Sequence, residues 1–64
     1  MDLKDFVGKY VYVIVGGFPY QGVIESDTKD YVRMIGEYGG QEVFLIIPKY
    51  EIDVIIVPRG DHHE

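Results

Sequence analysis

The sequence has no cysteine, tryptophan, asparagine or alanine, and it has one serine and one threonine among its 64 residues. The lack of cysteine excludes disulfides and thiolate metal sites and is typical of a reducing compartment, so we expect a cytoplasmic location. No apolar run approaches the roughly 18 residues that span a membrane, and no membrane partner is expected. The first nine residues carry Asp2 and Asp5 and lack the apolar centre of a signal peptide.

The scarcity of nucleophiles and bases argues against an enzyme. Ser26 is the only serine, and both histidines, His62 and His63, lie within the last three residues, where a base is poorly held. The sequence therefore predicts a protein without catalytic activity and without a cofactor. Together with Asp61 and Glu64, the histidines offer only an adventitious metal site, because a structural site needs ligands that are held in place. No resident metal is predicted.

The charge and the size of the chain limit which kinds of binding surface and how many domains it can have. The net charge of −5 and the isoelectric point of about 4.8 exclude a generally basic nucleic-acid-binding surface, although not a local site. A chain of this length hides only about 60% of its unfolded surface, so it is marginally stable alone. Its 47% hydrophobic content is too high for a disordered chain. The composition predicts one small domain over residues 1–60 and a flexible tail over 61–64.

The pattern of β-branched and aromatic residues predicts an all-β fold. Five runs are expected to be strands: 10–15, 18–26, 31–35, 42–47 and 52–57. The later connections are expected to be a turn, a loop and about one helical turn: 27–30, 36–40 and 48–51. A short helix is expected near residues 2–7, Gly16 and Gly17 suit a tight hairpin, and Gly22 marks a sharp bend. Five short, strongly bent strands predict a small closed or nearly closed barrel.

The last two predicted strands are apolar on both faces. In the first strand, alternate valines can fill the core while the residues between them face outward. The runs at 43–47 and 54–57 show no such alternation, although a solitary barrel has water on its outer face. An exposed apolar edge invites aggregation, so we predict an obligate homo-oligomer. Its interface is expected to contain Val43, Phe44, Leu45, Ile46, Val54, Ile55 and Ile56.

Two parts of the chain resemble motifs of the Sm-like superfamily. The segment LKDFVGKYVYV at 3–13, with YQGVI at 20–24, is similar to its first motif, and QGVIESD at 21–27 is similar to a strand of bacterial Hfq, a ring-shaped RNA chaperone. IPKYEI at 47–52 lies where Hfq has its second motif. The resemblance covers about residues 3–58. It implies a short N-terminal helix, five strongly bent strands and a ring of six or seven copies, in which strand four pairs with strand five of the next copy.

The resemblance also implies single-stranded RNA as a ligand, held at two loops that face the pore of the ring. The residues expected to contact RNA are Lys29, Asp30, Tyr31, Lys49 and Tyr50. The lysine of the second loop matches the family, whereas the asparagine of the first loop and the Arg-Gly of the second are missing. These differences and the acidic isoelectric point favour an alternative, an acidic Sm-like or SH3-like barrel that serves as a protein-interaction module without binding RNA.

Overall fold

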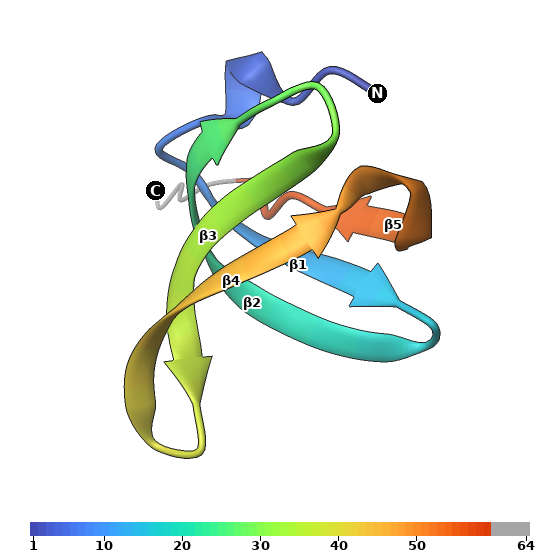
Figure 1. Cartoon of the computed structure of the whole chain (residues 1–64). Coiled ribbons are helices and arrows are strands. Elements are labelled where there is room, and N and C mark those ends of the chain that lie inside the picture. The colour runs from blue at the N-terminus through green and yellow to red at the C-terminus, as the bar shows by residue number, and fades with distance from the viewer. Residues whose placement is uncertain (60–64) are drawn as a thin grey trace.

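The computed structural model describes residues 1–59 as one five-stranded antiparallel sheet with two single turns of 3-10 helix (Figure 1). The elements are η1 (Lys4–Phe6), β1 (Tyr10–Val15), β2 (Phe18–Asp27), β3 (Tyr31–Tyr38), β4 (Gln41–Pro48), η2 (Lys49–Glu51) and β5 (Ile52–Ile56). The strand order is β4-β3-β2-β1-β5. The expected all-β class is confirmed. Among the described residues, neither helical turn is long and apolar enough to cross a membrane.

The expected N-terminal helix is wrong, because the chain forms only the single turn η1. Phe6 N–H donates to the Leu3 carbonyl at 2.9 Å, and Val7 N–H donates to the Lys4 carbonyl at 3.3 Å. Gly8, with a φ of 91°, then redirects the chain into β1. Starting a helix is costly and is repaid only over several turns, for which this segment is too short.

The connection between β3 and β4 is shorter than expected. Residues 36–38 extend β3, and the turn contains only Gly39 and Gly40, with φ values of 61° and 82°. The hairpin at Gly16 and Gly17 has the same form, with φ values of 59° and 81°, which confirms that expectation. Both pairs have the positive angles of a two-residue turn that suits the twist of antiparallel strands.

The sheet is open, so the predicted closed or nearly closed barrel is not confirmed. β5 pairs with β1 and β4 pairs with β3, which leaves one side of each without a partner strand among residues 1–59. The turn η2 joins these two edge strands. Figure 1 shows it at the end of β4, where the chain turns back into β5. The assignment to small barrels therefore remains a proposal.

The core lies on one face of the curved sheet. The alternate valines Val11 and Val13 are fully buried, as expected for β1, and the N-terminal segment adds Leu3. The other buried apolar residues are Ile24, Val32, Met34 and Ile47. Strand β5 ends at Ile56, one residue earlier than expected. The predicted tail over 61–64, including the histidines considered as metal ligands, lies outside the described residues.

Two glycines allow β2 and β3 to approach closely where the sheet curves. Gly22 and Gly36 are directly paired across the two strands. A Cβ added to Gly22 would lie 2.3 Å from the Ile35 carbonyl oxygen, and one added to Gly36 would lie 2.4 Å from the Gln21 carbonyl oxygen. The register then shifts between Ile24 and Ser26 as β2 bends. Gly22 is therefore required by backbone contact at the predicted bend.

Replacing Gly22 by alanine should test this contact. The added methyl group would meet backbone that cannot move as a flexible side chain does, so we expect Gly22→Ala to lower the free energy of unfolding by about 3 kcal/mol. Chemical denaturation measures this value. The neighbouring Gln21→Ala, at an exposed position, is the control and should change it by less than about 0.5 kcal/mol. Similar stabilities for the two variants would contradict the close-approach explanation.

Candidate nucleic-acid interface

The two loops that the sequence links to RNA lie side by side at one end of the sheet. Tyr31, which begins β3, pairs with Pro48, which ends β4. The Lys49 N–H donates to the Asp30 carbonyl at 2.9 Å, which ties η2 to the turn between β2 and β3. Figure 1 shows the hairpin that joins β3 to β4 at the far end of the same two strands. The antiparallel pairing of β3 and β4 therefore brings both predicted loops to one surface.

The turn between β2 and β3 is held by the only threonine of the chain. Thr28 Oγ1 donates to the Tyr31 carbonyl at 2.8 Å and accepts from the Tyr31 N–H at 3.1 Å. The Thr28 N–H also donates to the Tyr31 carbonyl, at 3.0 Å. Such local bonds between a hydroxyl and the backbone are characteristic of tight turns. They fix the position from which Tyr31 leaves the loop.

Four of the five predicted RNA contacts are exposed on this surface. Tyr50 is 85% exposed and Tyr31 is 41% exposed, and Lys29 and Asp30 are exposed beside them. Exposed aromatic rings give the flat faces on which unpaired bases stack. Lys29 supplies a positive charge, and the Asp30 carboxylate is a hydrogen-bond acceptor. We refer to Lys29, Asp30, Tyr31 and Tyr50 as the loop surface.

The fifth predicted contact, Lys49, does not reach the loop surface. Its side chain is only 9% exposed, and its Nζ lies 2.6 Å from Asp27 Oδ1. Nζ also donates to the Met1 carbonyl at 2.7 Å. In this arrangement the ammonium is satisfied inside the molecule and is not presented to a phosphate. Lys49 therefore positions η2, and we do not retain it as a direct ligand contact.

The sequence analysis did not identify Asp27, the partner of Lys49. Its Oδ2 accepts from the Leu3 N–H at 3.1 Å, so one carboxylate joins the N-terminal segment, β2 and η2. Burial by itself raises the pKa of Asp27, but the close ion pair with Lys49, the hydrogen bond from Leu3 and the positive charge of the N-terminal amine outweigh it. The pKa consequently lies below its ordinary value. No local pattern marks this role, because it depends on segments that meet only in the folded chain.

The side chain of Arg33, on β3, is engaged by neighbouring side chains. Its Nε donates to Glu25 Oε1 at 2.6 Å, and its guanidinium carbon lies 5.1 Å from the centre of the Phe44 ring. Both contacts are partly exposed. Arg33 therefore neutralises the Glu25 carboxylate. The described residues contain no cluster of three or more His, Cys, Asp or Glu side chains that could hold a metal ion.

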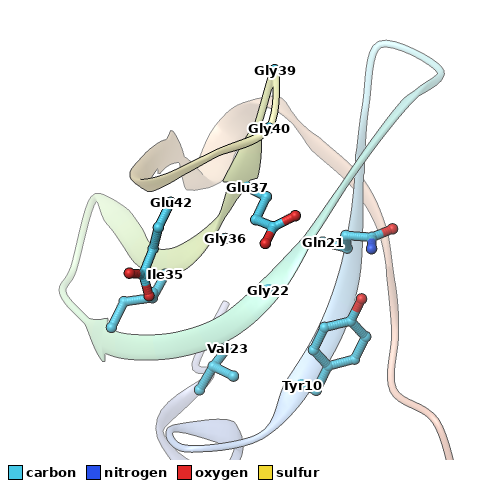
Figure 2. A pocket seen from close by; sticks show the side chains of 10 residues that line it. All are labelled: Tyr10, Gln21, Gly22, Val23, Ile35, Gly36, Glu37, Gly39, Gly40 and Glu42. Carbon is cyan, nitrogen blue, oxygen red and sulfur yellow. The ribbon is translucent and has the colours of Figure 1, made fainter.

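A separate groove of about 670 Å³ lies on the outer face of the sheet (Figure 2). Tyr10 stands on one side of it and Glu37 on the other, with the close contact of Gly22 and Gly36 between them. The pKa of Tyr10 is raised by partial burial first, and then by the Tyr12 hydroxyl and the Glu37 carboxylate. The groove contains the apolar side chains of Val23 and Ile35, and the carboxylates of Glu37 and Glu42 lie along its rim.

The predicted oligomer interface is divided between the two edge strands. On β4, Phe44 is 59% exposed and Ile46 is 60% exposed, and on β5, Val54 and Ile56 are 50% and 48% exposed. The remaining predicted interface residues, Val43, Leu45 and Ile55, are half-buried. The outer faces of both strands are thus apolar and open in the single chain.

No protein-family model matches this chain, and no curated protein does so either. The similarity to Sm-like proteins therefore rests on the sequence motifs, and any function derived from it is a proposal.

The pair formed by Asp27 and Lys49 predicts a specific response to acid. Because the pKa of Asp27 is lowered by folding, its stabilising contribution is present above the unfolded pKa of about 4 and is lost as the pH falls through the folded value. Asp27→Asn should lower the free energy of unfolding at pH 7 by about 3 kcal/mol, since Lys49 stays buried without its partner. The variant should also lose less further stability in acid than the wild type does.

Denaturation between pH 2 and pH 7 measures both effects. The control Asp5→Asn removes an exposed carboxylate and should leave the curve close to that of the wild type. Adding Lys49→Met to Asp27→Asn should recover part of the loss at pH 7, because no buried charge then remains unpaired. An Asp27→Asn variant with the same acid sensitivity as the wild type would contradict the assigned role.

Proposed function

We propose that this chain is an Sm-like, Hfq-like small-barrel protein that assembles into a homo-oligomeric ring and binds single-stranded RNA at the loop surface. In this proposal it has no catalytic activity. The observation that carries it is the juxtaposition of the two loops indicated by the motif resemblance. They lie side by side, and they present Tyr31 and Tyr50 to solvent.

The arrangement of the strands supports an Sm-like fold. β2 is long and strongly curved, β5 returns to pair with β1, and a single turn joins β4 to β5. These features agree with what the motif resemblance implies for the whole of residues 3–58. The open side between β4 and β5 is also where the resemblance places the contacts between neighbouring copies.

The two unpaired edges support assembly. An exposed edge strand with apolar side chains favours pairing with another strand. Because the β4 edge and the β5 edge are different surfaces, their pairing would be head to tail, and it gives a ring when the rotation between copies closes. A small domain gains from such an assembly, since one chain of this length buries little apolar surface.

RNA recognition at the loop surface would depend more on stacking than on charge. Each base that stacks on an exposed tyrosine ring contributes about 1–3 kcal/mol. Lys29 can approach a phosphate, and Asp30 can accept from a base amino group. Because Lys49 is held inside the protein, the surface offers few cations, and we expect only a weak dependence of binding on salt.

The groove on the outer face favours a second candidate, a protein-interaction module. It combines the apolar side chains of Val23 and Ile35 with the carboxylates of Glu37 and Glu42, a composition that suits a peptide better than RNA. This candidate predicts that no oligonucleotide binds the purified protein. A survey of short oligonucleotides at low salt separates the two candidates.

The native mass of the purified protein tests the assembly. We expect a mass of six or seven chains for the wild type by native mass spectrometry. Ile46→Lys should release monomers, because it places a charge on the exposed face of the β4 edge. Val7→Lys changes another exposed apolar residue, away from both edges, and should leave the assembly intact. A monomeric wild type would contradict the ring.

Binding of short U-rich and A-rich RNA oligonucleotides tests the loop surface. Tyr50→Ala should weaken binding by about 5- to 150-fold, which corresponds to the loss of one stacked base. Tyr38→Ala is the matched control, because Tyr38 is 63% exposed but lies at the opposite end of β3. Fluorescence anisotropy measures both affinities. Equal losses for the two variants, or no binding at 50 mM salt, would contradict RNA recognition at this surface.

A further inference from the structure

Glu37 and Glu42 form a pair that the single chain does not explain. They lie directly opposite each other on β3 and β4, so both side chains extend on the same face. Figure 2 shows them beside the outer groove. Like charges in directly opposed positions destabilise a sheet. Within residues 1–59, no Lys or Arg lies within 4.0 Å of either carboxylate.

Arg59 is a cation without a partner in the described part of the chain. It is exposed, it follows the end of β5 by three residues, and no carboxylate of residues 1–59 lies within 4.0 Å of it. β5 and β4 are opposite edges of the sheet. A second copy that pairs its β5 with this β4 would therefore bring an arginine toward the two carboxylates.

The hairpin turns determine which backbone groups face each free edge. Tyr38 and Gln41 flank the two-residue turn of β3 and β4, so they form a hydrogen-bonded pair, and such pairs alternate along the ladder. The backbone groups of Gln41, Val43 and Leu45 consequently point to β3. Those of Glu42, Phe44 and Ile46 point to the free edge.

The same reasoning applies to β5. Val15 and Phe18 flank the turn between β1 and β2, so the alternating ladder directs the backbone groups of Tyr12 and Ile14 toward β5. These two residues pair with Ile56 and Val54. The free edge of β5 therefore presents the N–H and C=O groups of the intervening Ile55. An extended backbone at residues 57–59 continues this alternation, so that Val57 and Arg59 also present their N–H and C=O groups to the free edge.

An antiparallel contact between these edges has one alignment that matches the side chains along its length. It sets Glu42 opposite Arg59, Phe44 opposite Val57 and Ile46 opposite Ile55. The alternate pairs, such as Leu45 with Ile56, are apolar as well. Pro58 then falls opposite Val43, at a position where the ladder needs no N–H from it.

Other alignments match poorly. Sliding β5 by two residues in one direction sets the charged Asp53 opposite the apolar Ile46. Sliding it by two residues in the other direction moves Arg59 from Glu42 to the apolar Phe44. A parallel contact that joins Phe44 to Val54 would bring Asp53 next to Glu42 and carry Arg59 away from both carboxylates. Such like-charge contacts disfavour an interface and thereby select among orientations.

We propose that neighbouring copies join β4 to β5 in this antiparallel register, with Arg59 of one copy held by Glu42 and Glu37 of the next. The contact rests on the assembly proposed above and specifies its orientation and register. It also explains why two carboxylates are opposed at the end of the β3–β4 ladder. The occupant of the acidic rim is a second copy of this chain.

Charge reversal tests the ion pair. Arg59→Glu and Glu42→Arg should each weaken the association of copies by about tenfold at every contact, as native mass spectrometry over a dilution series would measure. Glu42→Arg makes the chain less negative by two charges, so relief of general repulsion would instead strengthen association. The double variant should regain assembly, because every contact again joins opposite charges. An equal mixture of the two single variants should regain it in rings with an even number of copies, where the two variants alternate.

Controls with the same charge changes are Lys9→Glu and Asp5→Arg, which lie away from both edges and should leave association unchanged. If the wild type assembles but the two reversals behave like these controls, the ion pair is wrong while the assembly stands. A monomeric wild type removes the assembly itself, and the contact with it.

A disulfide tests the register independently, since the natural chain has no cysteine. Leu45 and Ile56 would be a closely spaced pair across the contact, with Cα atoms about 4.5 Å apart, which suits a disulfide. Leu45→Cys with Ile56→Cys in one chain should give a ladder of covalent oligomers on a non-reducing gel. Leu45→Cys with Val54→Cys should give much less, and the reverse result would overturn the register.

Discussion

The buried ion pair between Asp27 and Lys49 joins three segments that are distant in the sequence. The carboxylate also accepts from the backbone of Leu3, so the N-terminal turn, the end of β2 and the link between β4 and β5 are held at one point. Burying two charges is costly, and such a pair adds little stability compared with apolar packing. Its importance is positional, because it holds the loops that carry Tyr31 and Tyr50 next to each other.

The second constraint is the small size of the chain. Within residues 1–59, five strands wrap around a core of seven buried apolar residues, and the sheet ends in two strands that lack a partner on one side. Phe44 and Ile46 remain exposed on one of these edges, and Val54 and Ile56 on the other. The apolar surface that one copy cannot bury is therefore concentrated where a neighbouring copy can cover it.

The distribution of charge makes an acidic chain compatible with RNA binding. The opposed carboxylates of Glu37 and Glu42 lie near the hairpin that joins β3 to β4, whereas Lys29 and the exposed tyrosines lie at the other end of these strands. Charges separated by more than about 8–10 Å in physiological salt interact weakly through solvent. The net charge of −5 thus describes the whole chain better than it describes the loop surface.

Much of the local structure follows from local sequence, whereas the roles of individual side chains do not. The strand runs and the glycine pairs at both hairpins were predictable, because β-branching and positive φ act on the residues that carry them. The apolar second faces of β4 and β5 were predictable for the same reason. Gly36 was misassigned to a loop, since its contact with the Gln21 carbonyl exists only when β2 and β3 are paired.

The features of the loop surface also divide into those that the sequence predicts and those that only the fold decides. The sequence by itself determined which loops carry tyrosines and charges. The antiparallel order of the strands also follows from the sequence, because their connections are short. Only the tertiary structure decided that Lys49 faces inward, since the partner that draws it there, Asp27, lies on another strand. It also decided that the sheet stays open, because β5 can pair with β1 or β4 and the pairing depends on how the whole chain curves.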